Sequence, residues 1–180
     1  MSIDVSPLDW FPAISIWNRN DRAVGPGTAV DALLAVKEIV YEKKEMSLAE
    51  LGKVMAENWK GHEALRLRML RSKRKWGNND PEANALGAEL IDCYAGCLNG
   101  KPNSRGGIFL ACGHCARQFI DLGRRTGATP DGRRKGDEMS KNLSPTMSVD
   151  TDTLKLARAA RRCRAGAWRW GTRRLPVRRP

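Results

Sequence analysis

Residues 126–146 read TGATPDGRRKGDEMSKNLSPT, and this stretch decides how the rest of the chain is interpreted. Thr129-Pro130-Asp131-Gly132 has the composition of a tight turn, because proline fixes its own φ, aspartate hydrogen-bonds to nearby backbone and glycine tolerates a positive φ. A charged segment follows it, and Ser144-Pro145 makes a second rigid break. We therefore predict a polar loop framed by two turns, and not an element of the hydrophobic core.

The same loop carries a family resemblance. ATPDGRR (128–134) is followed by Gly136-Asp137 and then by Asn142-Leu143-Ser144-Pro145. In this order the residues resemble the signature of glycyl radical enzymes, the pyruvate formate-lyase-like family. The resemblance extends upstream through Asn103-Ser104-Arg105-Gly106-Gly107 to about Gly27, and it stops soon after the loop. Because members of this family are several times longer than this chain, we expect an internal fragment that lies between the cysteine loop and the glycyl radical loop.

The resemblance implies an α/β fold, in which this window is a partial, mostly helical segment of a ten-stranded α/β barrel. Inside that barrel, one finger loop carries a glycyl radical installed by an activating enzyme that uses S-adenosylmethionine and an iron–sulfur cluster. The other loop carries a cysteine that becomes a thiyl radical. The sequence contains neither an RVxGY-like nor a GCxE-like motif. We therefore expect the signature residues Thr129, Pro130, Asp131, Gly132 and Arg133 to shape the barrel wall, with no catalytic or metal-binding residue in this chain.

The resemblance also sets expectations for activity and partners. It implies a cytoplasmic lyase, dehydratase or acyltransferase of anaerobic metabolism that cleaves a C–C, C–O or C–N bond in a small-molecule substrate. The full-length enzyme is expected to be a homodimer that meets the radical-activating enzyme. This fragment is expected to be inactive alone and to bind no cofactor. Uncovered strand edges and apolar helix faces predict poor solubility or association with other chains.

Charge is distributed very unevenly along the chain. The formal net charge is +12, but Thr151–Pro180 holds ten of the basic residues and one acidic residue, so that the preceding 150 residues are nearly balanced. One alternative is a small nucleic-acid-binding protein that acts through this Arg/Trp-rich tail. The favoured interpretation is a disordered or frame-shifted tail, because arginine, glycine, tryptophan and proline accumulate there while acidic residues vanish. Nucleic acid is therefore not an expected partner.

The N-terminus and the cysteine content exclude two classes of protein. Residues 1–25 lack a basic region followed by an unbroken apolar run, which argues against a secretion signal. No run approaches the ~20 apolar residues of a membrane span, so no membrane partner is expected. The odd count of five cysteines favours reduced thiols in the cytoplasm.

Apolar periodicity organises the middle of the chain into helices and one strand. The predicted helices span residues 28–41, 47–59, 62–75, 81–97 and 117–124, and the predicted buried positions include Leu33, Tyr41, Leu48 and Cys97. Three helix starts are predicted from capping residues: Thr28 with Asp31, Ser47 with Glu50, and Asp80 before Pro81. A short strand, Ile108–Ala111, is expected to be buried on both faces. We divide the chain into an unassigned segment (1–26), a family domain fragment (27–150) and the tail (151–180).

The predicted helix 62–75 is strongly basic on one side, with Arg66, Arg68, Arg71, Lys73, Arg74 and Lys75. Such a side is either a solvated helix face or a phosphate-binding patch. We favour the solvated face, because Leu65, Met69 and Leu70 still give this helix a core side.

The cysteines suggest one further alternative, a zinc or CxxC redox module. Cys112-Gly113-His114-Cys115 matches the redox motif of thioredoxin-like disulfide isomerases, and Cys93, Cys97, Cys112 and Cys115 have the spacing of a four-thiolate zinc site. The strands that a thioredoxin fold requires are missing downstream. We therefore favour buried or half-buried thiols without metal, since Cys93 and Cys97 lie one turn apart in an amphipathic helix. His62 is expected to be exposed, and His114 shares the low expectation of the zinc site.

Overall fold

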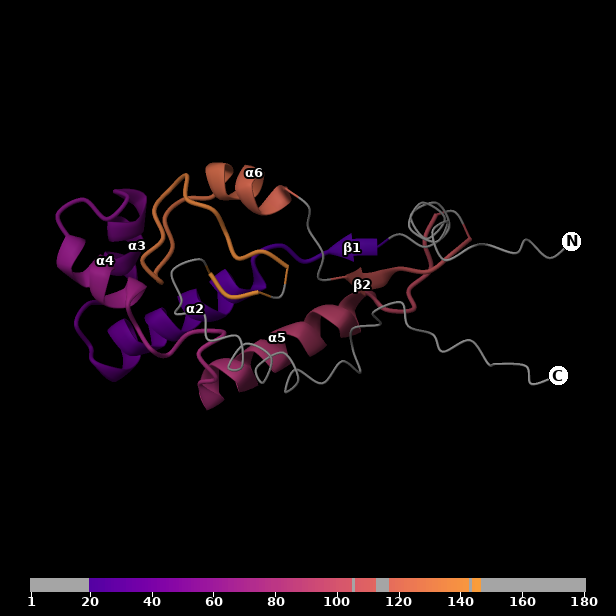
Figure 1. Ribbon diagram of the computed structural model, residues 1–180, viewed down its shortest axis with the longest axis horizontal. Helices are drawn as coiled ribbons and strands as arrows, with labels where there is room; N and C mark the ends of the chain where they lie inside the picture. The colour runs from indigo at the N-terminus through magenta and orange to yellow at the C-terminus, as the bar shows by residue number, and fades with distance from the viewer. Residues whose placement is uncertain (1–19, 105, 113–116, 143, 147–180) are drawn as a thin grey trace, which may run out of the picture.

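The computed structural model describes residues 20–104, 106–112, 117–142 and 144–146. The elements in chain order are β1 (Asn20–Arg22), α2 (Pro26–Val36), η1 (Lys37–Glu42), α3 (Leu48–Ala56), α4 (Glu63–Leu70), α5 (Pro81–Leu98), β2 (Leu110–Cys112) and α6 (Gln118–Arg125). In Figure 1, α3 and α4 lie at one end of the molecule and the β1–β2 pair lies toward the other, with α2 and α5 between them. The described part is therefore mostly helical with little strand, as predicted for this window.

Helix α2 begins earlier than the sequence indicated. Gly25 precedes it with φ 78°, and Pro26 occupies its first turn, where a missing N–H costs nothing. The predicted capping box of Thr28 and Asp31 is wrong, because both residues lie inside the helix and are buried. The Thr28 N–H, one of the amides that a helix start leaves unpaired, donates to Ser140 Oγ at 3.0 Å, and the Ser140 N–H donates back to Thr28 Oγ1 at 2.8 Å. The cap thus comes from a residue more than a hundred positions away.

Helix α2 runs directly into the π-helix η1, where the Lys43 N–H donates to the carbonyl of Glu38 five residues earlier, at 2.9 Å. Two ion pairs share this spacing: Glu38 with Lys43 at 2.6 Å and Lys37 with Glu42 at 3.8 Å. In an α-helix, residues five apart point in widely different directions, so both pairs depend on the wider π turn. The wider turn also explains why Tyr41, predicted to be buried from an α-helical period, is 64% exposed.

The capping box of helix α3 is confirmed. The Ser47 N–H donates to Glu50 Oε2 at 2.7 Å, and the Glu50 N–H donates to Ser47 Oγ at 3.2 Å. Leu51 and Val54 are buried, but the predicted burial of Leu48 is wrong, because this first residue of the helix is 56% exposed. The packed side of α3 begins one turn later than its apolar pattern.

Helix α4 ends at Leu70 instead of continuing to residue 75. The reason is tertiary: the Trp76 N–H donates to Asp31 Oδ1 at 2.7 Å, which draws the segment after α4 onto helix α2. The indole of Trp76 then packs against α5 where Gly87 leaves room, since a Cβ there would lie 2.1 Å from the ring. Val30, Leu34, Ala83 and Ile91 complete this core cluster between α2 and α5.

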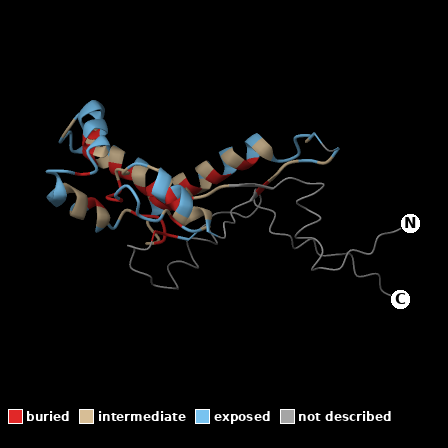
Figure 2. Cartoon of the chain, turned by 90° about the horizontal axis from the view of Figure 1, so that it is seen from above, coloured by how far each residue is buried: buried red, intermediate tan, exposed pale blue. Residues whose placement is uncertain are grey.

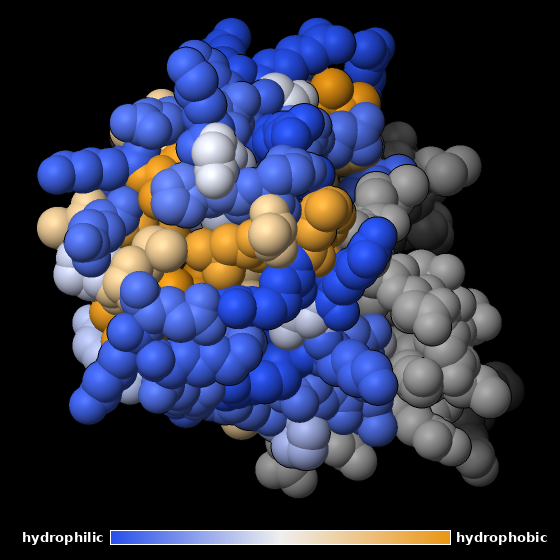
Figure 3. All heavy atoms as spheres, turned by 90° about the vertical axis from the view of Figure 1, so that its left-hand side faces the viewer, coloured by the Kyte–Doolittle hydropathy of each residue, from blue (hydrophilic) through white to orange (hydrophobic). Residues whose placement is uncertain are grey.

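A second cluster lies at the other end of α2 and joins η1 to α3 and α4. Its buried members are Ala35, Ile39, Leu51, Val54, Trp59 and Met69. Figure 3 looks onto this end of the molecule and shows an apolar band between hydrophilic surfaces. Through these two clusters, α2 packs against α5 at one end and joins η1, α3 and α4 at the other.

Helix α5 starts as predicted, with Asp80 Oδ1 accepting from the Ala83 N–H at 2.8 Å and Pro81 in the first turn. Its buried positions include Ala83, Gly87, Ile91 and Ala95, which recur every four residues. The burial predicted for Cys93 and Cys97 is wrong: both are exposed, since each lies two positions, about 200° around the helix, beyond a buried residue. Figure 2 shows buried and exposed residues alternating along this helix.

Two short strands form a parallel sheet at the end of α5. Asn20 pairs with Leu110, Asp21 with Ala111 and Arg22 with Cys112. Strand β1 lies in the N-terminal segment to which the sequence assigned no role. The strand begins two residues later and ends one residue later than predicted, and its expected burial on both faces fails at Ile108, which is exposed. Ile108 instead forms an antiparallel bridge with Pro102, within the loop that precedes the strand.

Candidate functional site

The signature residues form a closed turn. The Thr129 N–H donates to the Arg133 carbonyl at 3.0 Å, and the Gly132 N–H donates to the Thr129 carbonyl at 3.2 Å. The hydroxyl of Thr129 donates to Asp131 Oδ1 at 2.5 Å, as expected for an aspartate that stabilises a turn. Gly132 has φ 98°, a conformation that glycine adopts without the strain that a side chain would cause. The loop predicted from the composition is therefore present.

Helix α4 approaches this turn so closely that Gly132 has no space for a side chain. A Cβ at Gly132 would lie 2.7 Å from the Arg66 carbonyl oxygen and 2.9 Å from the Leu70 amide nitrogen. Arg66 reinforces the contact by donating from Nη1 to the Gly132 carbonyl at 3.1 Å. Trp59 adds a third link, because its indole N–H donates to the carbonyl of Arg133 at 3.2 Å. Residues 59–70 thus fix the turn from one side.

Arg133 is the centre of the loop. Its side chain is buried, at 5% exposure for the residue, and its guanidinium donates to the backbone carbonyls of Gly123, Thr126, Gly127, Arg134 and Asp137. The contact with Asp137 is 2.8 Å long. Burial lowers the pKa of Arg133 below its usual range, against the opposing effect of the carboxylates of Asp131 and Asp137. A guanidinium saturated by carbonyls organises backbone, and it leaves little capacity for a ligand.

A buried polar centre lies beneath the turn. The Lys75 ammonium, in a residue that is 2% exposed, donates to the carbonyl of Asp131 at 3.2 Å. Asp31 accepts from the Trp76 N–H and, through Oδ2, from the Thr146 hydroxyl at 3.3 Å. Burial raises the pKa of Asp31 to about 7, although the positive charge of Lys75 and the hydrogen bond from Trp76 act in the opposite direction. This centre joins helix α2, the segment after α4 and both ends of the loop.

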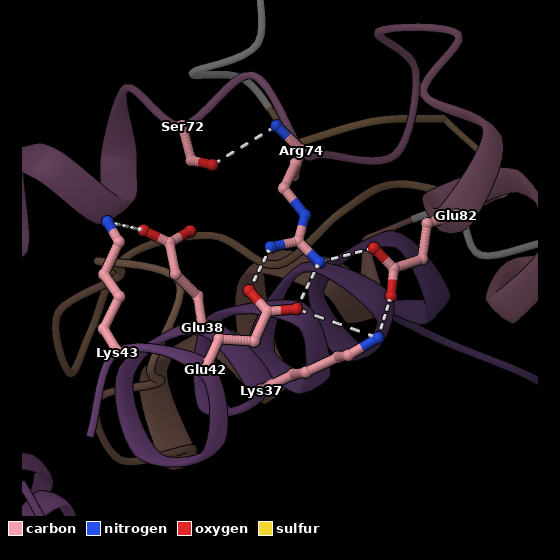
Figure 4. A network of polar contacts seen from close by, with 7 residues as sticks. All are labelled: Lys37, Glu38, Glu42, Lys43, Ser72, Arg74 and Glu82. Atoms are coloured by element: carbon pink, nitrogen blue, oxygen red, sulfur yellow. Dashed lines mark hydrogen bonds and ion pairs between the residues drawn. The ribbon is translucent and has the colours of Figure 1, made fainter.

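The contacts of the basic residues in 62–75 distinguish a solvated helix face from a phosphate-binding patch. Arg66 pairs with Glu63, and Arg68 pairs with Glu45. Arg74 lies between Glu42 and Glu82, and Glu82 also pairs with Lys37 (Figure 4). Three of these six basic residues, Arg66, Arg68 and Arg74, are therefore paired with carboxylates, which disfavours a phosphate-binding patch. The solvated-face interpretation is correct for Arg71, which is exposed, and wrong for Lys75.

The cysteine motif is only partly within the described residues. Cys112 ends β2, whereas Gly113, His114 and Cys115 lie outside those residues, as does the tail from 151 to 180. In the part of the chain that the structure describes, no three His, Cys, Asp or Glu side chains gather as a metal site would require. None of the described helices combines the length and hydropathy needed to cross a bilayer.

The polar centre was missed by reasoning from the sequence. Lys75 was counted with its basic neighbours, and Asp31 was read as half of a capping box. Neither residue type gives a local signal of burial, because charged residues are usually exposed unless they are paired. The partners of Asp31 and Lys75 are 45 and 56 positions away, so no sequence window brings them together.

Comparisons with known proteins identify the family of this chain. The pyruvate formate lyase-like family model matches residues 17–114, more than half of the chain and including β1. The chain belongs to this family, and its relatives are glycyl radical enzymes. The match begins about ten residues upstream of the start that the resemblance suggested.

Two curated relatives illustrate the similarity. The chain is 34% identical over 132 residues to (2S)-3-sulfopropanediol dehydratase from Klebsiella oxytoca, covering 73% of this chain and 16% of that enzyme. It is 31% identical over 134 residues to trans-4-hydroxy-L-proline dehydratase from Clostridioides difficile, covering 74% of this chain and 17% of the relative. The chain thus spans about one sixth of the length of the relatives that it matches.

Solved structures agree with the sequence relatives. Hydroxyproline dehydratase from Clostridioides difficile, with trans-4-hydroxy-L-proline bound, superposes with a TM-score of 0.75 at 28% identity, over 81% of this chain and 18% of that one. The glycerol-bound, B12-independent glycerol dehydratase from Clostridium butyricum gives 0.66 at 30% identity, over 71% and 16%. These matches support a segment of a glycyl radical enzyme, and they lend no support to the nucleic-acid, zinc or redox alternatives.

Proposed function

We propose that this chain is a wall segment of a glycyl radical dehydratase or related lyase, with no catalytic activity of its own. The observation that carries the proposal is the superposition on hydroxyproline dehydratase, a substrate-bound enzyme, over four-fifths of this chain. Dehydratases recur among the relatives, which favours C–O cleavage over the acyltransferase chemistry of the wider family. The substrate class that these names share is a small molecule bearing a hydroxyl group.

The residues of this chain contribute structure to that enzyme. In an activated enzyme the glycyl radical, installed by an activating enzyme with S-adenosylmethionine and an iron–sulfur cluster, supplies hydrogen-atom abstraction. The sequence contains neither of the two motifs that carry this chemistry, so no radical step is assigned to its side chains. The role of Thr129, Pro130, Asp131, Gly132 and Arg133 is to hold one rigid turn against α4, where it closes the wall around the reaction space.

The small sheet fits the same proposal. In the described residues, β1 and β2 pair with each other over three residues, and a parallel pair of this size is marginal without neighbours on its edges. Strands from the remainder of a ten-stranded barrel would supply those neighbours. We further propose that the complete enzyme is a cytoplasmic homodimer, and that residues 27–150 form the family domain fragment that precedes the basic tail.

A chimaeric enzyme tests the proposal. Residues 20–146 of this chain replace the equivalent segment of the Klebsiella oxytoca dehydratase, which is then activated anaerobically by its own activating enzyme. We expect the glycyl radical signal in electron paramagnetic resonance and measurable, though reduced, dehydration of (2S)-3-sulfopropanediol. A matched chimaera with Arg133→Met should lose both, because the turn no longer holds its shape. A soluble, folded chimaera that forms no radical and turns over no substrate would refute the wall assignment, as would turnover by the isolated chain.

A further inference from the structure

Helices α2 and α5 leave a groove between them on the surface of the molecule. Its apolar floor is formed by Leu33, Leu34 and Leu86, and its α5 wall is formed by Glu82, Ala85 and Glu89. Lys37 lines the opposite side, where its charge is paired with Glu82. Leu33 is 48% exposed, a large apolar side chain left partly in water beside charged residues. An apolar floor with one charged wall is suited to an amphipathic segment of opposite charge.

The charged residues of α5 are all acidic. Helix α5 contains Glu82, Glu89 and Asp92 and no lysine or arginine. At 100° per residue, these three carboxylates fall within an arc of about 80° on one side of the helix. Glu82 is occupied by Lys37 and Arg74, whereas Glu89 and Asp92 are exposed and make no ion pair with any residue that the structure describes. Two unneutralised carboxylates therefore lie on this side of α5, Glu89 in the wall of the groove and Asp92 three residues beyond it.

We propose that this groove binds the basic C-terminal segment of the same chain, residues 153–167. That segment reads TLKLARAARRCRAGA and contains five basic residues and no acidic residue. Its leucines and alanines match the apolar floor, and its arginines match Glu89 and Asp92. The basic run of residues 62–75 is a poorer candidate, because Arg66, Arg68 and Arg74 are paired with carboxylates and Lys75 is buried.

The covalent connection favours this occupant over a second copy. The described residues end at Thr146, whose hydroxyl donates a hydrogen bond to Asp31 of α2. Leu34 of α2 and Lys37, the first residue of η1, line the groove three and six residues further along the chain, which is about 9 Å of helical rise. Residues 147–152 span up to roughly 20 Å when extended, so the segment reaches the groove without strain. A tether this short gives an effective concentration in the millimolar range, above that of a second molecule in dilute solution.

The chain carries its own reporters for this contact. Cys93 lies on the exposed side of α5 next to Asp92, and Cys163 lies between Arg162 and Arg164 in the proposed occupant. Alkylation by N-ethylmaleimide, followed by peptide mass spectrometry, reports the accessibility of each thiol separately. At low salt we expect Cys93 to react several-fold more slowly than it does in 0.5 M NaCl. A short bismaleimide should join Cys163 to Cys93 or Cys97 within single molecules.

Charge exchange provides the decisive variant set, with the full-length chain kept throughout. Glu89→Lys with Asp92→Lys should abolish the salt-dependent protection of Cys93, and so should Arg158→Glu with Arg162→Glu. Combining all four substitutions should restore it, because the attraction is rebuilt with opposite signs. Lys53→Glu, at an exposed position of α3, serves as the matched charge control and should change nothing.

Three results would overturn the proposal. One is an alkylation rate of Cys93 that depends on neither salt nor tail charge in the unmodified chain. Another is loss of protection on dilution, or cross-links between two molecules, because a second copy would then be the occupant. The third is failure of the four-fold variant to regain protection although its circular dichroism is native. None of these results bears on the family membership or on the chimaera, which omits the tail.

Discussion

The signature loop and the surface ion-pair network each depend on one arginine, and the two arginines act in different ways. Arg133 lies inside the signature loop and donates to backbone carbonyls, whereas Arg74 lies at the surface between the carboxylates of Glu42 and Glu82. Burial lowers the pKa of Arg133, while the hydrogen bonds that Arg74 donates to its two carboxylate partners raise the pKa of Arg74. Arg133 determines the path of a loop, and Arg74 links helices that also pack through apolar contacts.

The difference teaches where sequence changes will matter. A buried donor that serves several carbonyls leaves all of them unpaired when it is removed, and each unpaired group carries a desolvation cost. An exposed ion pair is screened by water and salt, and its partners are rehydrated once it is broken. Substitutions in the loop should therefore act strongly on stability, and those in the surface network weakly.

The largest effect is expected for Arg133→Met. The substitution keeps the length of the side chain but removes the hydrogen bonds that the guanidinium donates to the loop carbonyls. It should lower the free energy of unfolding by about 3–5 kcal/mol. Urea unfolding followed by tryptophan fluorescence measures this. Arg134→Met is the neighbouring control, because Arg134 is exposed and pairs with exposed Glu63. Equal losses in the two variants would show that Arg133 does not organise the loop.

The second largest loss of stability is expected for Gly132→Ala. Gly132 and Gly136 both have a positive φ, of 98° and 97°, but a Cβ at Gly136 meets nothing within 4 Å. Both alanine variants bear the backbone strain of about 1 kcal/mol, and only Gly132→Ala also collides with helix α4. We expect Gly132→Ala to lower the melting temperature well beyond the effect of Gly136→Ala. Matching melting temperatures would mean that α4 can shift to accommodate the added Cβ without a loss of stability.

The raised pKa of Asp31 leads us to expect that the stability of the fold decreases as the pH rises from 4 to 7. Its pKa is raised from 3.8 to about 7 on folding, so the folded chain binds more protons than the unfolded chain between these values. The contribution of Asp31 is therefore fully present below pH 4 and is lost as the pH rises toward 7, with a slope approaching ~1.4 kcal/mol per pH unit. Asp31→Asn should flatten that part of the pH profile of unfolding, while keeping an acceptor for Trp76. An unchanged slope in the variant would assign the titration to another group.

The smallest effect is expected in the surface network. Arg74→Gln removes the links to Glu42 and Glu82, and the free energy of unfolding should fall by less than about 1 kcal/mol. The loss should shrink further in 0.5 M NaCl, because salt already screens exposed pairs. A loss that rivals that of Arg133→Met, or one that salt leaves unchanged, would remove the distinction between the two regions.

What the sequence predicted correctly was local. The Ser47–Glu50 capping box and the Asp80-Pro81 helix start each depend on residues within one turn, and both are present. The family was predicted from one ordered motif, which also depends on neighbouring residues. These features need no knowledge of the fold, because the partners of each residue lie beside it in the chain.

What the sequence did not predict depends on distant partners. The end of α4, the burial of Lys75 and the cap of α2 by Ser140 arise from contacts between segments 45 to 112 residues apart. The π turn of η1 was not predicted for another reason, because an apolar pattern analysed at 3.6 residues per turn does not detect a wider turn. Tyr41 was therefore predicted to be buried. The candidate site was thus located from its motif, while the residues that hold it in place were not.

The pairing of β1 with β2 bears on the order in which the molecule assembles. Its two strands are separated by about ninety residues, a span that includes every helix from α2 to α5. During synthesis, Asn20–Arg22 leaves the ribosome long before Leu110–Cys112 exists, so the helices have time to pack before the sheet closes. Closing so long a loop late, for the gain of three residue pairs, makes this contact a slow step of folding and an early one to open on unfolding.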